Sequence, residues 1–251
     1  MTALRPLRHV KALLAASAGD PFVLAEADER RILHAWRTDD GAVGWLTPSR
    51  RVAGRGHIVA LGPPGAAADL LLAALAVGVD ASSVTLPRDT DRHLPAHRLR
   101  PRNDWEWFCT ESAPPMVPHE DRAELLDRTD WPEVSELLDR ASPRHDVRPG
   151  EAGVLRWLGI RDGSGQLTAV AAHAEHVKGV PHLASIATEP EHRQQGLGAA
   201  VTAALTRRCL GEGRSPVTLG MYSDNAVARR VYERLGFSRP HEFTSGRLLP
   251  R

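Results

Sequence analysis

The chain has 251 residues, of which 42% are hydrophobic and 25% charged, the balance of a folded globular protein and not of a disordered one. Its formal net charge of +1 at pH 7 excludes the large basic excess of a general nucleic-acid-binding protein. The two cysteines lack a C-x-x-C spacing, and the longest apolar stretch, residues 66–79, is too short to cross a bilayer. We expect a cytoplasmic protein with reduced thiols and with neither a membrane nor a nucleic-acid partner.

The length suits two small domains. Between Trp107 and Leu125 the sequence loses its hydrophobic periodicity and contains three prolines, as an exposed linker does. We therefore place a boundary at residues 111–126, with one domain at residues 1–110 and a second at residues 127–251.

The first half predicts a mixed series of helices and strands. A helix is expected at residues 4–18, and short strands are expected at 22–27, 32–37 and 43–46. A buried strand at 57–61 leads through a turn at 62–65 into a helix at 66–77, and strands follow at 83–86 and 104–108. Pro63 and Pro64 remove backbone donors from that turn, so this half is expected to be a scaffold or a wall of the substrate site.

The second half also alternates strands and helices, and its signals for the ends of these elements are clearer. Thr129 or Asp130 caps a helix with Pro132 in its first turn, and strands at 154–160 and 167–175 flank a hairpin turn at 162–165. A strand at 182–188 precedes a helix that ends near Gly211, and a strand at 217–222 precedes a last helix at 226–235. The fold class is therefore α/β (α+β), with a mixed sheet in each half.

Residues 193–198, with the sequence RQQGLG, lie between the strand at 182–188 and the helix that follows. Gly196 and Gly198 lack Cβ atoms where the backbone must approach a ligand closely, and the helix start supplies unpaired N–H groups with partial positive charge. This placement predicts a phosphate cradle, although a pair of glycines alone is a weak signal.

Two sequence blocks together are far more specific. EPEHRQQGLG at residues 189–198, followed by DNAVARRVYERLGF at 224–237, resembles the GNAT superfamily of acyl-CoA-dependent N-acyltransferases over residues 127–240. The tandem layout resembles the glycine N-acyltransferase-like branch, in which a degenerate GNAT-like half precedes an intact one. For residues 1–110 the similarity is architectural only.

The resemblance implies acetyl-CoA as the acyl donor. Its pyrophosphate would bind the amides of the glycine loop, and its pantetheine arm would pair with the strand before the loop and lie near the last helix. The implied acetyl-CoA-binding residues are Ile186, Ala187, Thr188, Arg193, Gln194, Gln195, Gly196, Leu197, Gly198, Ala199, Asn225 and Ala228.

The resemblance also implies the catalytic groups. Tyr232 would protonate the departing CoA thiolate, and Asn225, Ala228 and Tyr232 share one helix face at spacing i, i+3, i+7. Many GNAT enzymes use a Glu on the strand before the loop as general base, but the comparable position here is His182, which can accept a proton from an ammonium group. The other candidates for the base, on the preceding strand, are His173, Glu175 and His176.

The histidines show no metal-ligand spacing, and neither cysteine lies in a nucleophile motif, so no metal and no acyl-enzyme are expected. The resulting hypothesis is an N-acyltransferase that moves an acetyl or other short acyl group from CoA to a primary amine by direct attack in a ternary complex. The alternative is a catalytically silent acyl-CoA-binding or sensing module that has lost its base. The acceptor stays open among small amines, amino acids, antibiotics and protein N-termini, as does the oligomeric state.

Overall fold

The computed structural model describes residues 2–49, 52–95 and 99–249. The chain divides into two compact units, and each is described by itself. The first consists of Met1–Trp107, Met221–Asp224 and Arg239–Arg251, and the second of Phe108–Gly220 and Asn225–Ser238. Both units are discontinuous, whereas the sequence predicts the contiguous domains 1–110 and 127–251. The reason is the last strand, β12 (Ser238–Leu248), which pairs with a strand near residue 85 and so belongs mainly to the first unit.

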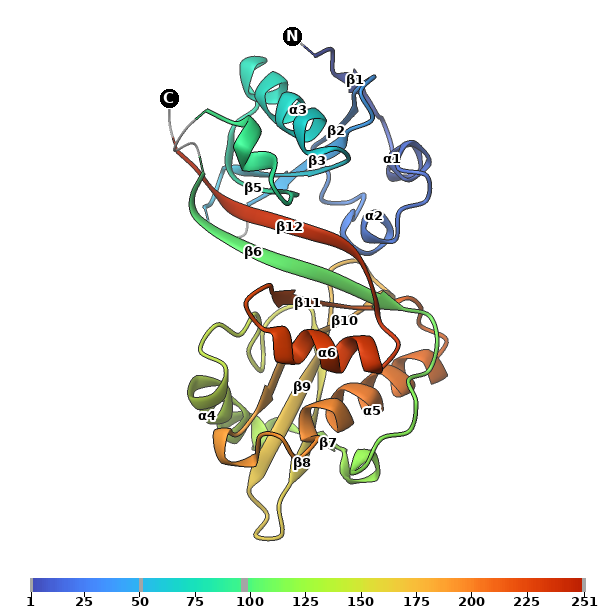
Figure 1. The fold of residues 1–251 in the computed structure, drawn as a ribbon, viewed down its shortest axis with the longest axis vertical. Helices are drawn as coiled ribbons and strands as arrows, with labels where there is room; N and C mark the ends of the chain where they lie inside the picture. Colours follow the sequence, from blue (N-terminus) through green and yellow to red (C-terminus); the bar gives the residue numbers. More distant parts are fainter. Residues whose placement is uncertain (1, 50–51, 96–98, 250–251) are drawn as a thin grey trace. The chain divides into compact units, whose positions relative to one another are not determined.

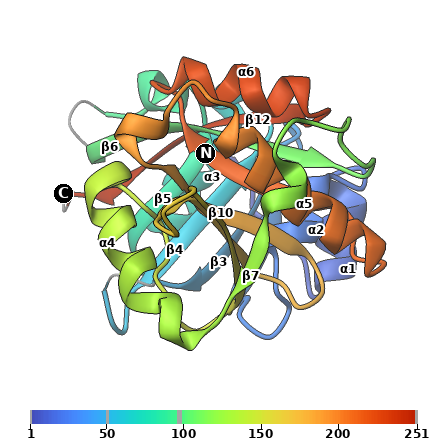
Figure 2. The same cartoon turned by 90° about the horizontal axis from the view of Figure 1, so that it is seen from below.

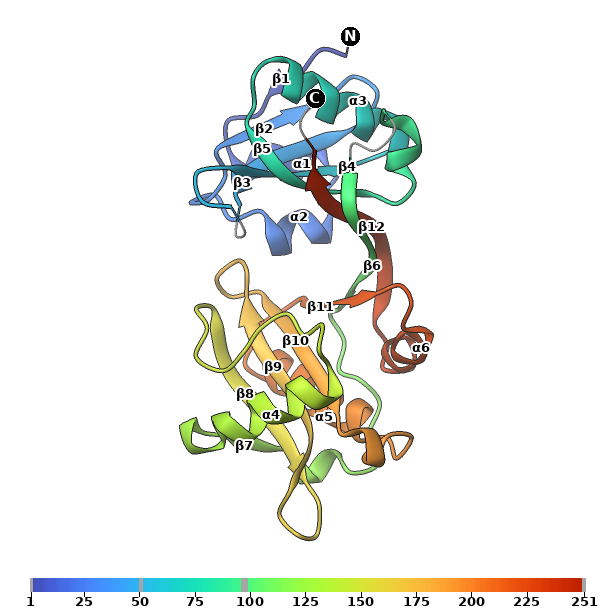
Figure 3. The same ribbon diagram turned by 90° about the vertical axis from the view of Figure 1, so that its left-hand side faces the viewer.

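In the first unit the strands are neighbours in the order β1-β2-β3-β4-β5-β12-β6. They are β1 (Arg5–Pro6), β2 (His34–Arg37), β3 (Val43–Pro48), β4 (Gly56–Leu61), β5 (Ala81–Pro87), β12 and β6 (Leu99–Thr110). β4 and β5 are parallel, while β12 runs antiparallel to β5. Figure 3 shows α3 (Pro64–Ala76) and α2 (Pro21–Glu26) on opposite sides of these strands.

Two clusters form the core of the first unit. On the α3 side, the buried residues Leu70 and Leu71 pack with Ile58 and Val84. In the other cluster Phe22 of α2 is surrounded by aromatic rings, including Trp107 at 5.4 Å and Phe243 at 4.6 Å between ring centroids. Successive residues of β4 and β5 are mostly buried, so both faces of this sheet are covered.

In the second unit the strand order is β11-β10-β9-β8-β7, comprising β11 (Val217–Tyr222), β10 (Pro181–Thr188), β9 (Leu167–Glu175), β8 (Val154–Arg161) and β7 (Glu124–Leu126). β10 and β11 are parallel, and the other neighbours are antiparallel. α4 (Trp131–Ala141) and α5 (Leu197–Gly211) lie on opposite sides of β10 in Figure 2. A third helix, α6 (Ala226–Arg234), follows β11 (Figure 1).

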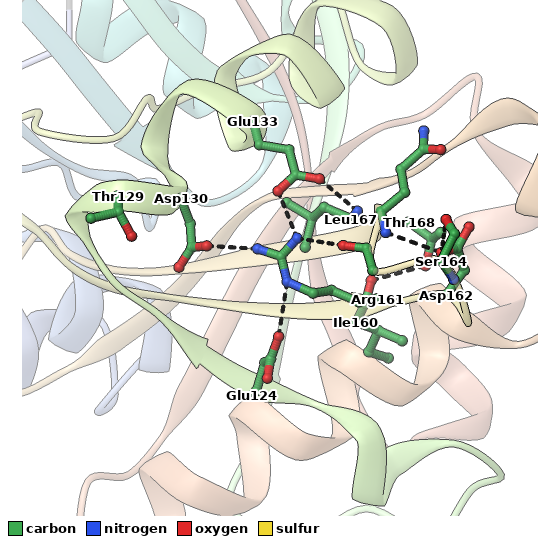
Figure 4. Close-up of polar contacts among 12 residues, drawn as sticks. Glu124, Thr129, Asp130, Glu133, Ile160, Arg161, Asp162, Ser164, Leu167 and Thr168 are labelled. Carbon is green, nitrogen blue, oxygen red and sulfur yellow. Dashed lines mark hydrogen bonds and ion pairs between the residues drawn. The ribbon is translucent and has the colours of Figure 1, made fainter.

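A polar network joins the elements at one edge of the second unit (Figure 4). The Arg161 guanidinium donates to Glu124 at 3.1 Å, Glu133 at 2.7 Å and Asp130 at 2.6 Å. Glu133 also accepts the backbone N–H of Leu167 at 2.7 Å. One arginine thus connects β7, the start of α4 and the β8–β9 hairpin through charge-assisted hydrogen bonds.

Most predicted elements are confirmed within a few residues, and the mixed α/β fold class is confirmed. The expected strand at residues 22–27 is wrong: this segment is helix α2, because the Asp20 side chain accepts the Phe22 N–H at 2.8 Å and Pro21 occupies the first turn. The expected helix at 4–18 is wrong in its first half, where the chain forms β1 before α1 (Val10–Ala16).

Two further differences concern connections. The expected linker at 111–126 contains a 3-10 turn at Glu120–Arg122 and the short strand β7, held in part by the pair of Glu120 with Arg207 at 2.7 Å. The sequence reasoning also missed β12, whose alternation is interrupted by Pro240 and Gly246. Among the described residues, no helix is long and apolar enough to span a membrane.

Candidate functional site

The glycine loop enters α5 through two residues in the left-handed region. Gln194 has φ +65° and Gly196 has φ +81°, and α5 begins at Leu197. A Cβ atom added to Gly196 would meet nothing within 4 Å, whereas one added to Gly198 would lie 3.1 Å from Thr188 Oγ1. Gly196 is therefore required by its backbone conformation and faces open space, and Gly198 allows the helix start to approach the end of β10.

Six consecutive amides of this loop lack a protein acceptor. Within the described chain, none of the N–H groups from Gln194 to Ala199 donates to a backbone or side-chain oxygen, and the first such bond of α5 joins Ala200 N to Gly196 O at 2.9 Å. Amides at a helix start carry partial positive charge and bind oxyanions. Unpaired N–H groups therefore lie where the sequence predicts a phosphate cradle, and the binding of a phosphate there stays a prediction.

The side chain of Arg193 is directed elsewhere. Its Nη2 donates to Ala141 O at 3.0 Å and its Nε to Thr188 O at 3.4 Å. Nearby, the buried Glu189 carboxylate accepts from Arg140 at 3.0 Å. These contacts connect the end of β10 with the end of α4. The Arg193 guanidinium therefore stabilises the position of the loop.

β10 carries a bulge just before the loop, a feature that the sequence reasoning missed. Ala184 pairs with Ala172 on β9 and Ala187 pairs with Val170, so two residues of β10 oppose one of β9. Ser185, inside the bulge, has φ +48°. Its hydroxyl accepts from Val147 N at 2.9 Å and donates to Val147 O at 2.8 Å, which fixes this strained conformation. A non-glycine residue with positive φ leaves no reliable signature in a single sequence.

On its other side β10 separates from β11. The parallel register between these strands consists of His182 with Thr218 and Leu183 with Leu219. The segment Ile186, Ala187 and Thr188, expected to contact the pantetheine arm, lies beyond this register. Its backbone is therefore not paired with β11 in this register, and its contact with the pantetheine arm stays a prediction.

His182 lies at the last stretch of pairing before the strands separate. It is 8% exposed, and its Nδ1 is 3.0 Å from Thr218 Oγ1. Its ring stacks on His176, with centroids 4.6 Å apart and an angle of 28° between ring planes. The structure thus brings together two of the histidines that were considered as general bases.

The other two candidates belong to the core and its polar border. His173 is completely buried with Nδ1 3.7 Å from Cys209 Sγ, and burial lowers its pKa to about 4. Burial raises the pKa of the Cys209 thiol to about 11. Glu175 is bound to Arg214 and accepts Gly179 N at 2.9 Å. These contacts favour packing roles for His173 and Glu175.

The residues of α6 also take distinct positions. Asn225 is the N-cap, and its Oδ1 accepts Ala228 N at 3.0 Å, so it precedes the helical face on which Ala228 and Tyr232 lie. The Tyr232 ring packs against Phe108 and Phe237, with centroids 5.8 and 6.2 Å away. Burial raises the pKa of the Tyr232 phenol, so this group is neutral across the physiological range.

The features described so far are a glycine loop with unpaired amides, a bulged strand and a parallel pair that separates. Solved structures are similar to this chain over most of its length. A GCN5-related N-acetyltransferase from Sphaerobacter thermophilus superposes with a TM-score of 0.58 and 16% identity, over 88% of this chain and 81% of that one. One from Kribbella flavida gives a TM-score of 0.54 and 20% identity over 97% and 96%. The chain has the GNAT acetyltransferase fold.

The sequence comparisons single out the second half. Residues 157–244 match the family model described as FR47-like protein, and these residues include the bulge, the glycine loop and α6. Mycothiol acetyltransferase from Kocuria rhizophila is 33% identical over 87 residues, which are 35% of this chain and 25% of that protein. The chain therefore matches about a quarter of the length of this curated relative. The glycine N-acyltransferase-like branch and the tandem layout stay predictions.

Proposed function

We propose that this protein is a GNAT-type N-acyltransferase that moves an acetyl or other short acyl group from CoA to a primary amine. The observation that carries the proposal is the row of unpaired amides from Gln194 to Ala199 at the start of α5, directly after a bulged strand that has separated from its parallel neighbour. The GNAT fold of the chain and the sequence similarity of residues 157–244 support it.

Acetyl-CoA fits these residues as follows. Its pyrophosphate would accept hydrogen bonds from the loop amides, and its pantetheine amides would pair with the backbone of Ile186–Thr188. The side-chain carbonyl oxygen of Asn225 accepts the Ala228 N–H in the helix cap. Its side-chain NH₂ group could therefore donate to the ligand. The Arg193 side chain would act through the loop and not on the phosphates, because it is bound to two backbone carbonyls.

Acyl transfer by direct attack needs a proton acceptor and a group that stabilises the departing sulfur. In this proposal His182 takes one proton from the ammonium acceptor, and the amine nitrogen then bonds to the thioester carbon. The C–S bond breaks with its electron pair on sulfur, and the surplus proton of the new amide nitrogen passes to the thiolate, which gives the amide and CoA thiol. The Tyr232 phenol is a donor to that sulfur. Its raised pKa makes complete proton transfer to a thiolate unfavourable, so we expect Tyr232 to act mainly as a neutral hydrogen-bond donor.

The first unit contributes a scaffold in this proposal. We infer that it is a degenerate GNAT-like domain, because its β4–α3–β5 segment repeats the strand–helix–strand order of the second unit with a proline-containing turn in place of the donor loop. The name of the relative from Kocuria rhizophila supports an acetyl group as the transferred acyl group. The acceptor panel should include small amines, amino acids, amine-bearing antibiotics and peptides with a free N-terminus.

Two measurements test the proposal. Calorimetry with acetyl-CoA should show saturable binding to the full chain, and release of CoA thiol should depend on an added amine and exceed a water blank. Absence of binding at millimolar acetyl-CoA would exclude the function. Binding without turnover for every amine of the panel would instead favour the silent acyl-CoA-binding or sensing module.

A further inference from the structure

Ser185 joins the bulge of β10 to the loop at residues 142–153, which connects α4 with β8 in the same unit. Its hydroxyl accepts Val147 N at 2.9 Å and donates to Val147 O at 2.8 Å, so one oxygen is both acceptor and donor to one residue. Val147 lies outside any strand, and within the described chain its N–H and C=O have no other hydrogen-bond partner. The hydroxyl therefore pairs with Val147 in the way that a strand backbone would.

This contact holds a backbone conformation that is unfavourable by itself. Ser185 has φ +48°, in the left-handed region that residues other than glycine rarely adopt, and its side chain is buried. Ala184 and Ala187, which flank the bulge, belong to the core cluster on which Val147 packs. Such strain persists only where surrounding contacts fix it, and the bond of Ser185 with Val147 is such a contact. The shape of the bulge and the position of the loop are therefore coupled.

The bulge lies at the acyl end of the expected acetyl-CoA site. The pyrophosphate is expected at the amides that follow Arg193, and the pantetheine arm is expected to run back along β10 from Thr188 to Ile186. The thioester at the end of this arm would then fall near Ser185, which follows His182 by three residues. An amine that attacks the thioester must approach beside the same segment. The loop that Ser185 holds would therefore border the acceptor.

We propose that Ser185 is a positioning residue, whose hydroxyl locks the bulge of β10 and the loop 142–153 together so that the loop forms one wall of the amine site. This inference rests on the proposed function, since it assigns a role within the same reaction. Ser185 acts through Val147 and through its own backbone, and its side chain contacts neither the acyl group nor the amine.

Two substitutions separate the hydroxyl from the backbone strain. Ser185→Ala removes the hydroxyl and keeps a Cβ at positive φ, whereas Ser185→Gly removes the hydroxyl and also relieves the strain. Both variants should lower kcat/KM for the amine about 30-fold, mostly through KM, since small displacements of positioning groups have effects of this order. Acetyl-CoA affinity should change less than about threefold, because the amides from Gln194 to Ala199 are retained. The unfolding temperature should fall more in Ser185→Ala than in Ser185→Gly.

A matched control comes from Thr110, in the same unit. Its hydroxyl also accepts from and donates to one residue, Ser112, at 3.2 and 3.1 Å, but these two residues are close in the sequence. Thr110→Val should therefore lower stability without changing kcat/KM. Amide hydrogen exchange reads the proposed contact directly. The Val147 N–H should be protected in wild type and should exchange at least about tenfold faster in both Ser185 variants.

Each outcome decides the inference. Wild-type kcat/KM in Ser185→Ala would overturn it, and so would recovery of kcat/KM in Ser185→Gly, because strain alone would then explain the loss. If Ser185→Ala does not fold, Ser185→Gly carries the test. If wild type binds acetyl-CoA but acetylates no amine, the proposed function fails, and the exchange of the Val147 N–H still decides the coupling. Equal exchange in wild type and variants would overturn it.

Discussion

The turn before α3 and the loop before α5 occupy the same place in two strand–helix–strand segments, but they differ in what their glycines and donors do. Gly62 has φ +114°, and a Cβ there would lie 2.7 Å from Gly41 O. Gly196 has φ +81°, and a Cβ there would meet nothing within 4 Å. One glycine is therefore required by the packing of the protein itself, while the other borders open space.

The two segments also differ in their backbone N–H donors. Pro63 caps α3 without a side-chain hydrogen bond and Pro64 follows it, so two of the positions that could bind an anion have no N–H. The loop before α5 has six unpaired amides over the same part of the motif. Similar topology therefore does not imply a similar site, because binding depends on donors and space at a few residues.

The largest expected effect on stability concerns one histidine in each unit. In the first unit the partly exposed His241 lies 2.9 Å from Asp20 Oδ1. In the second unit His173 Nε2 is buried 3.6 Å from Glu175 Oε1 and has no hydrogen-bond partner. The pKa of His173 is lowered from 6.5 to about 4, so the unfolded chain binds more protons between these values and stability falls as pH falls through that window. Between pH 7.5 and pH 5 we expect a loss of about 2 kcal/mol from this residue.

Urea unfolding of wild type and His173→Asn at the two pH values measures this loss. The variant has no ring to titrate, so the pH-dependent part of its unfolding free energy should be smaller than that of wild type by the same amount. If the unfolding free energies of the two proteins depended on pH in the same way, protonation of His173 would not contribute to the loss of stability.

The next effect concerns chemistry. Tyr232→Phe removes the proposed donor to sulfur but keeps the ring packing with Phe108 and Phe237, so kcat should fall by roughly 100-fold while acetyl-CoA affinity changes little. Steady-state kinetics and calorimetry separate the two quantities. Unchanged kcat would remove Tyr232 from the mechanism, and a loss confined to affinity would assign it to binding.

A smaller effect is expected on acetyl-CoA affinity when matched glycines of the two halves are replaced. Gly196→Ala places a Cβ at φ +81°, and Gly78→Ala, in the turn after α3, places one at φ +87°, both in open space. The backbone strain is matched at about 1 kcal/mol each. Thermal unfolding should therefore respond equally, but only Gly196→Ala should weaken acetyl-CoA binding, by about tenfold. Equal binding by both variants would contradict the role of the loop.

The smallest effect on acetyl-CoA affinity is expected from a variant that removes a side chain of the loop but keeps its backbone amides. Arg193→Ala removes a guanidinium that binds Ala141 O and Thr188 O, while every amide from Gln194 to Ala199 is retained. Acetyl-CoA affinity should fall by less than about threefold, with slightly lower thermal stability. A loss as large as that of Gly196→Ala would mean that the side chain itself contacts the phosphates.

Local sequence signals predicted much of the fold. Periodicity and caps placed β11 at its observed bounds and α5 within the expected limits, because hydrophobic spacing and glycine stops act over a few residues. The expected strand at 22–27 is a helix, because the cap from Asp20 and the aromatic cluster around Phe22 outweigh the strand preference of Phe22 and Val23.

The candidate site divides in a similar way. The sequence by itself determined the glycine loop, the helix that follows it and the Asn225 to Tyr232 block, since each depends on residues close together in the chain. Only the tertiary structure decided that β10 bulges at Ser185, that His182 is bound to Thr218 and that His173 faces Cys209. These features depend on residues about 36 to 38 positions apart. Strand register brings His182 to Thr218, and the packing of a loop and of α5 on the sheet brings Val147 to Ser185 and Cys209 to His173, so local propensity predicts none of them.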